Sequence, residues 1–167
     1  MSIMAFHRLF PHIAEMETRS LTLYPLSDPT KVRDVPNGLY SFLESYCVDP
    51  RCDCRRVLIS VFADTQRRVV ATISHSFEWP GRDDVTPEQT FLDSLNPQSQ
   101  YSQALLRLFL EGVLDPGYAA RLVRHYTIVK VAVVDPKNPI HRRIAELTQT
   151  HEGDGNAKRR KQKKRWR

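Results

Sequence analysis

The sequence predicts an α+β fold: a small antiparallel β-meander of three or more strands, packed with helices, and a metal knuckle at one hairpin end. Two observations support this fold. Short connections separate three strand-like runs, and residues before and after them repeat apolar side chains at helical spacing. The strand-like runs are 39–47, 55–63 and 68–77. We expect one domain over residues 1–150 and a flexible, disordered basic C-terminal tail over 151–167.

Length and composition favour a cytoplasmic protein. A chain of 167 residues with 41% hydrophobic content can bury a core without disulfides. No apolar run approaches the roughly 18 to 20 residues that span a bilayer. The first twenty residues lack the apolar centre of a signal peptide. In a reducing compartment, an odd number of clustered cysteines favours metal ligation over disulfides.

The N-terminal half supplies one helix pattern and then the strands. Residues 5–18 predict a short helix interrupted at Pro11, and residues 21–24 are extended. In the run 57–62 the apolar residues occupy both alternating faces, so we expect this strand at the centre of the sheet with both faces covered. Residues 64–67 form a connection of hairpin length.

The C-terminal half predicts helices. One begins at Ser99 or Ser102 and ends near Asp115. Residues 117–134 have the valine-rich composition of a strand, yet their larger side chains recur at intervals of three and four. We therefore predict a helix here, followed by another over Pro139–Leu147.

The three cysteines are the strongest chemical signal. Cys47, Cys52 and Cys54 have the spacing C-x4-C-x-C. Cys47 ends one predicted strand and Cys54 opens the next, so the two face each other across the neck of a hairpin, with Cys52 in the loop between them. Three sulfurs that converge in this way suit a tetrahedral metal such as zinc, in a structural role. Reduced structural or redox-active thiols are the alternative.

A closed zinc site needs a fourth ligand, for which we select His75. If the second hairpin turns near residues 65–66, His75 pairs with Arg56, and a one-residue bulge would place its ring beside the metal. Asp49, Asp53 or a water molecule are the alternatives. Neighbouring arginines at 51, 55 and 56 either offset the negative charge of the thiolates or form an exposed basic rim.

Two segments resemble a signature of uncharacterised bacterial proteins. They are Tyr46-Cys-Val-Asp-Pro-Arg-Cys-Asp-Cys-Arg-Arg56 and Phe91-Leu-Asp-Ser-Leu-Asn-Pro-Gln-Ser99. The resemblance covers most of residues 37–135 and implies a helix over 117–134. Some proteins of this group carry a cysteine-rich SEC-C motif at the C-terminus, whereas this sequence is basic there and has no cysteine. The resemblance implies no known activity.

The positive charge is concentrated at the C-terminus. Eight Lys or Arg residues and no acid lie within 157–167, and the other 17 basic residues against 19 acidic ones give residues 1–156 a net charge of −2. Such a segment binds RNA or DNA without reading sequence, and a terminal aromatic can stack on an unpaired base. A solvated tail that aids solubility is the alternative. The predicted contacts are Lys158, Arg159, Arg160, Lys161, Lys163, Lys164, Arg165, Trp166 and Arg167.

No catalytic motif is present in the sequence. It contains no P-loop, G-x-G-x-x-G, H-E-x-x-H or G-x-S-x-G. His125 and His141 are expected on helix surfaces. We therefore predict a non-enzymatic, zinc-stabilised binding or accessory protein, with nucleic-acid contact through the tail. The alternative is an enzyme that uses an open zinc position or a reactive thiol at Cys52 or Cys54.

Overall fold

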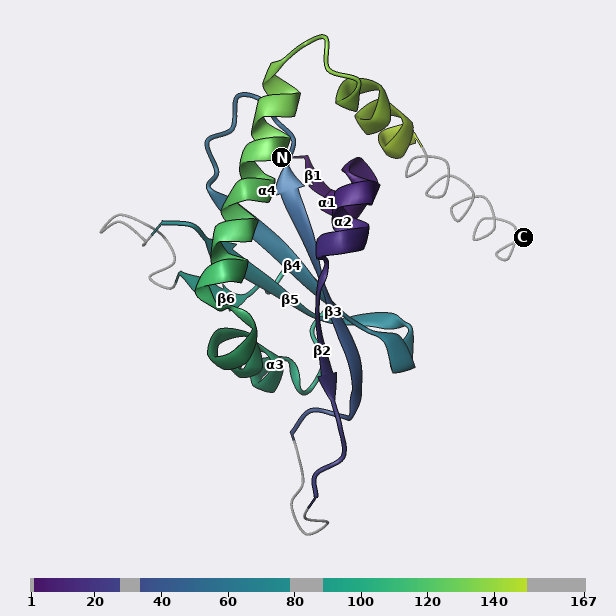
Figure 1. Cartoon of the computed structure of the whole chain (residues 1–167), viewed down its shortest axis with the longest axis vertical. Coiled ribbons are helices and arrows are strands. Elements are labelled where there is room, and N and C mark those ends of the chain that lie inside the picture. The colour runs from purple at the N-terminus through teal and green to yellow at the C-terminus, as the bar shows by residue number, and fades with distance from the viewer. Residues whose placement is uncertain (1, 28–33, 79–88, 150–167) are drawn as a thin grey trace, which may run out of the picture.

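The computed structural model describes residues 2–27, 34–78 and 89–149 and confirms a mixed α+β fold. Its antiparallel sheet has six strands, with the order β1-β3-β4-β5-β6 and with β2 also paired to β3 (Figure 1). The strands are β1 (Ile3–Ala5), β2 (Arg19–Leu23), β3 (Gly38–Cys47), β4 (Arg56–Ala63), β5 (Arg68–Ser76) and β6 (Thr90–Leu92). The helices are α1 (Phe6–Leu9), α2 (Pro11–Glu17), α3 (Ser102–Leu108), α4 (Pro116–Val134) and a helix over residues 140–149.

β3 organises the N-terminal part of the chain. β1 and β2 both pair with the same edge of β3: Ile3 lies opposite Cys47, and Leu23 lies opposite Gly38. The helices α1 and α2 fill the interval between these two short strands (Figure 1). Pro11 occupies the first turn of α2, where its missing N–H costs no hydrogen bond. The predicted interruption of the helix at Pro11 is therefore confirmed.

β4 lies inside the sheet, between β3 and β5, as predicted. Its two faces differ, however. Val57, Ile59 and Val61 are fully buried, whereas Leu58, Ser60 and Phe62 are only partly covered. The expectation that both faces are covered is therefore wrong, because the helices that pack on the sheet bury the Val57–Ile59–Val61 face.

The register between β4 and β5 changes at a bulge. Near the turn, Ala63 pairs with Arg68 and Phe62 with Val69, which is the predicted register. Beyond it, Val61 pairs with Ala71, so Val70 is an extra residue in β5. From Val61 to Arg56, each residue of β4 therefore pairs with a β5 residue one position later than predicted. His75 consequently lies opposite Val57, and the predicted pairing of His75 with Arg56 is wrong.

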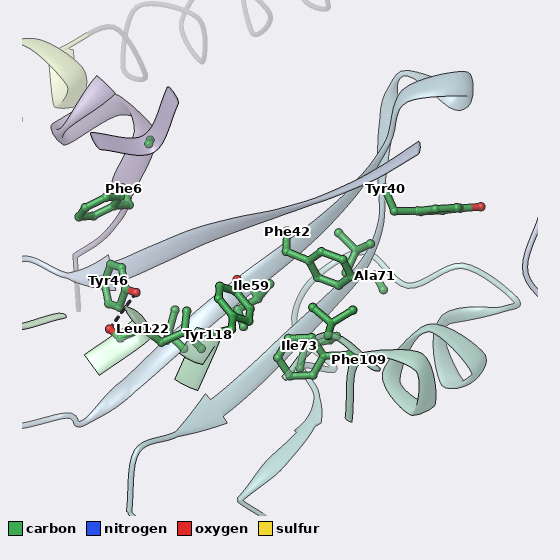
Figure 2. Packing of buried hydrophobic residues seen from close by; sticks show 14 of the residues in the cluster. Phe6, Tyr40, Phe42, Tyr46, Ile59, Ala71, Ile73, Phe109, Tyr118 and Leu122 are labelled. Carbon is green, nitrogen blue, oxygen red and sulfur yellow. Dashed lines mark hydrogen bonds between the residues drawn. The ribbon is translucent and has the colours of Figure 1, made fainter. Parts of the chain in front are cut away.

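α4 packs across the sheet and confirms the helical prediction for residues 117–134. Asp115 caps its first turn, since Asp115 Oδ1 accepts a hydrogen bond from the Tyr118 amide at 2.8 Å. Figure 2 shows Tyr118 and Leu122 beside the apolar side chains of the sheet. Of the valines in this run, Val129 and Val133 are buried with Tyr118 and Leu122, whereas Val131 and Val134 are exposed. Two strands were not predicted: β1 and β6 have three residues each, too few to show a period.

A buried polar network connects β3, α4 and α2. The Glu44 carboxylate accepts a hydrogen bond from the Tyr46 hydroxyl at 2.8 Å and lies 2.6 Å from His125 Nδ1. His125 Nε2 lies 2.9 Å from Glu17 Oε2, and the imidazole ring stacks on Phe6. Each ring nitrogen of His125 therefore lies within hydrogen-bonding distance of a carboxylate. His125 is 1% exposed, so its predicted surface position is wrong.

We expect His125→Ala to lower the free energy of unfolding by about 3 to 5 kcal/mol, because it removes the imidazole that lies 2.6 Å from the buried Glu44 carboxylate. Arg124→Ala is the matched control. It removes the half-exposed guanidinium that also pairs with Glu17, and it should lower the free energy of unfolding by less than about 1 kcal/mol. Urea unfolding followed by circular dichroism measures both. Equal losses in the two variants would contradict the role assigned to the buried pair.

Candidate metal centre

The structure brings the three cysteine sulfurs together where β3 passes into β4. Cys47 is the last residue of β3 and is buried, while Cys52 and Cys54 lie in the connecting loop and are partly exposed. All three sulfurs lie within 4.8 Å of one another. A tetrahedral zinc with bonds of about 2.3 Å holds its sulfurs roughly 3.8 Å apart. Small movements of the loop are thus enough to close the site.

A turn in the loop directs Cys52 back toward Cys47. The Asp49 side chain accepts a hydrogen bond from the Arg51 amide at 2.9 Å, and the Cys52 amide donates to the Asp49 carbonyl at 3.2 Å. Asp at the first position and Pro50 at the second are the residues that such a turn favours. The segment Asp49-Pro50-Arg51-Cys52 therefore sets the position of the second sulfur.

Lys130 holds this loop against α4. Its Nζ donates to the Cys52 carbonyl at 2.8 Å and to the Asp49 carbonyl at 3.1 Å. The sequence analysis missed this residue, although it is the one charged side chain in the valine-rich run 127–134. Lys130, rather than the arginines of the loop, is the cation that stabilises the cysteine cluster. Arg51 is almost fully exposed, and Arg56 donates to the Ser74 hydroxyl.

The thiols of Cys52 and Cys54 differ in acidity. The hydrogen bond from Cys54, with further contributions from Cys47 and Lys130, lowers the pKa of the Cys52 thiol. Burial, together with the hydrogen bonds to Cys52 and Cys47, raises the pKa of Cys54 to about 12. The Cys52 thiol is therefore more acidic than the Cys54 thiol. A thiophilic cation replaces thiol protons when it binds, so the donor set fits a metal such as zinc.

None of the predicted fourth ligands joins the sulfur cluster. Within the described ranges, the group that can hold a metal consists of the three cysteines. His75 Nδ1 lies instead 2.8 Å from Thr90 Oγ1, and its ring packs against Phe77 and Phe109. The shift at the bulge in β5 explains this position, because it turns His75 to the face of the sheet that bears Val57.

The two aspartates of the loop also remain outside the cluster. Asp49 accepts the Arg51 amide, while Asp53 is 90% exposed and lies 3.7 Å from Arg55 Nε. A surface hollow of about 570 Å³ adjoins the sulfurs, between the loop, the end of β5 and α4. Cys52, Phe77, Tyr126 and Lys130 are among the residues that line it. The cluster is therefore accessible on the side of Cys52.

The predicted nucleic-acid contacts, Lys158 to Arg167, lie outside the described residues. Within the described part of the chain, no helix is long and apolar enough to cross a membrane. No protein-family model matches the sequence, and comparisons with curated proteins and with solved structures found no match. The resemblance of 46–56 and 91–99 to uncharacterised bacterial proteins stays a prediction.

In metal-free protein, we expect iodoacetamide to alkylate Cys52 first at neutral pH, about tenfold faster or more than Cys54. The lowered pKa of Cys52 supplies thiolate, whereas the raised pKa of Cys54 withholds it. Peptide mass spectrometry after timed quenching measures the three rates. Lys130→Met should slow the reaction of Cys52, and alkylation of all three cysteines at the same rate would contradict the difference in acidity.

Proposed function

We propose that this chain is a non-enzymatic, zinc-stabilised binding or accessory protein, with Cys47, Cys52 and Cys54 as zinc ligands. The convergence of the three sulfurs is the observation that supports it. Thiolates are soft ligands, and a cluster of three favours zinc over magnesium or calcium, which prefer oxygen. Bound zinc would replace the thiol protons and join the three sulfurs through metal–sulfur bonds.

The position of the cluster supports a structural role for the metal. Cys47 belongs to β3, pairs with Ile3 of β1, and lies beside the loop that Lys130 attaches to α4. A metal here would thus connect the sheet, the loop and the helix. Zinc-finger peptides gain roughly 10 to 16 kcal/mol from zinc. This chain also has a buried core, so loss of the metal should loosen the cysteine end rather than unfold the whole domain.

The hollow beside Cys52 supports the second candidate, an enzyme with an open metal position. A zinc with three protein ligands and one water can activate that water. The hollow is large enough for a small molecule, and Tyr126 and Lys130 offer it an aromatic ring and a positive charge. The number of protein ligands separates the two candidates. Four protein ligands favour a structural zinc site, whereas three protein ligands and one water molecule favour a catalytic site.

We expect purified protein to contain about one zinc per chain by elemental mass spectrometry, and Cys52→Ser to lose it. His75→Gln is the matched control and should keep its zinc, because His75 hydrogen bonds to Thr90 away from the sulfurs. X-ray absorption at the zinc edge then counts the sulfur and the nitrogen or oxygen ligands. A metal-free wild type with three titratable thiols would rule out the zinc proposal. Loss of zinc in His75→Gln would restore His75 as a ligand.

We further propose that the segment 157–167 contacts RNA or DNA. Eight basic residues within eleven positions support this, since they can displace counterions from a phosphate backbone. The rest of the chain has a net charge of −2 and offers no comparable excess of cations. Binding should therefore reside in this segment and carry little sequence preference.

Truncation after Asn156 should remove binding to a fluorescent single-stranded oligonucleotide in an anisotropy titration. The affinity of the full chain should fall steeply with salt, with a log–log slope of roughly −0.7 per phosphate neutralised. Trp166→Ala tests stacking and should cost about 1 to 3 kcal/mol. Equal affinity of the truncated and full-length proteins would contradict the proposal.

A further inference from the structure

The outward face of α4 carries a stripe of apolar side chains that the described residues leave exposed. Val123, Val131 and Val134 are 44%, 67% and 64% exposed, and Ala120 and Thr127 are also exposed. At 3.6 residues per turn, these five positions fall within about 40° of one line along the helix. We call Ala120, Val123, Thr127, Val131 and Val134 the α4 stripe.

The one hydroxyl in the α4 stripe has a hydrogen-bond partner within the helix. Thr127 Oγ1 donates to the Val123 carbonyl at 2.9 Å, so Thr127 presents mainly its methyl group. The stripe contains no charged residue. Valine is a poor helix former, and three exposed valines gain nothing from the core on the opposite face of α4. Packing among the described residues therefore does not explain this composition.

The α4 stripe is symmetric about Thr127. Val123 and Val131 lie four residues before and after it, and Ala120 and Val134 lie seven residues before and after it. When a helix packs antiparallel on a copy of itself about a two-fold axis at Thr127, Val123 meets Val131 of the copy and Ala120 meets Val134 of the copy. This is the self-complementarity that a two-fold interface requires. The small side chains also let the two helix backbones approach closely.

The charged residues beside the α4 stripe already have partners within the chain. Arg124 flanks one side and pairs with the Glu17 carboxylate. Lys130 flanks the other side and donates to the carbonyls of the cysteine loop. Both cations can therefore remain at the rim of an interface, without being buried unpaired.

We propose that the α4 stripe binds a second copy of this chain, with the two α4 helices antiparallel about a two-fold axis at Thr127. A single pair of helices buries less than the roughly 1,200 Å² of a standard interface, so the dimer should be weak and dependent on concentration. Val123, Thr127 and Val131 also line the hollow beside Cys52, so the dimer would cover that hollow. None of the five residues is a candidate ligand, so the proposal does not rest on metal binding.

Sedimentation velocity of the full chain over a range of concentrations tests the dimer. We expect wild type to pass from monomer to dimer between about 1 and 100 μM, the range of weak interfaces. Thr127→Arg places two like charges at the two-fold axis and should weaken the dimer at least tenfold. Leu95→Arg, at a 93% exposed position elsewhere on the surface, is the control and should dimerise like wild type. Circular dichroism confirms that each variant is folded.

Cysteine cross-linking tests the antiparallel arrangement. Thr127→Cys should cross-link to itself with oxidised glutathione, since the axis brings its two copies together. Val123→Cys and Val131→Cys should not cross-link alone, because eight helical residues separate the identical positions by about 12 Å, beyond the ~7 Å Cα limit of a disulfide. A mixture of these two variants should cross-link. Wild type, with its native cysteines, measures the background.

Three outcomes would overturn the proposal. The first is a wild type that stays monomeric at every concentration. The second is a dimer that Thr127→Arg leaves intact, which would place the interface elsewhere on the molecule. The third is a Val123→Cys variant that cross-links to its own copy more readily than to the Val131→Cys variant, because that result would make the two helices parallel.

Discussion

The pairing of Glu44 with His125 is the constraint on which the rest of the structure depends. A carboxylate on the helix-covered face of β3 is costly to bury, and it persists there because α4 presents His125 at 2.6 Å and Tyr46 adds a hydroxyl. The second ring nitrogen of His125 then reaches Glu17 at the end of α2. Burial alone would raise the pKa of Glu17, but the hydrogen bond to His125 and the charge of Arg124 hold it below its ordinary value. Glu17 thus stabilises the fold above the pKa of an unfolded Glu, and this stabilisation is lost as pH falls.

This pairing fixes the rotation of α4 about its own axis, and this rotation determines what each face of the helix contacts. With His125 directed at β3, Lys130 reaches the carbonyls of the cysteine loop, and Val123, Thr127 and Val131 point to solvent. The candidate metal centre and the exposed stripe are therefore both consequences of one buried contact. A change at His125 should disturb the cysteine loop even though no atom of His125 touches it.

The features that the sequence predicts are local in the chain. The strands β3, β4 and β5 each have at least eight residues, long enough to show a period, and the three cysteines lie within eight positions. Contacts between distant residues cannot be predicted in this way. Glu44 and His125 are 81 positions apart, and nothing near either residue in the sequence identifies the other. The predicted pairing of His75 with Arg56 failed for a similar reason: one extra residue, Val70, moved every later partner in β5. Strands of three residues, such as β1 and β6, depend on their neighbours for pairing and leave no pattern of their own.

The two-part pairing of β1 and β2 along one edge of β3 has a consequence for synthesis on the ribosome. The first 23 residues emerge early, yet their strand partners, 38–47, follow later. The contact between Glu17 and His125 spans 108 residues and forms only after most of α4 has been made. Until then α1 can contact β3, where Phe6 packs on Tyr46, but the contacts of Phe6 and Glu17 with His125 are missing, and part of the apolar surface of α1 and α2 remains accessible to chaperones. Residues 3–17 thus complete their native contacts only after His125 of α4 has been made.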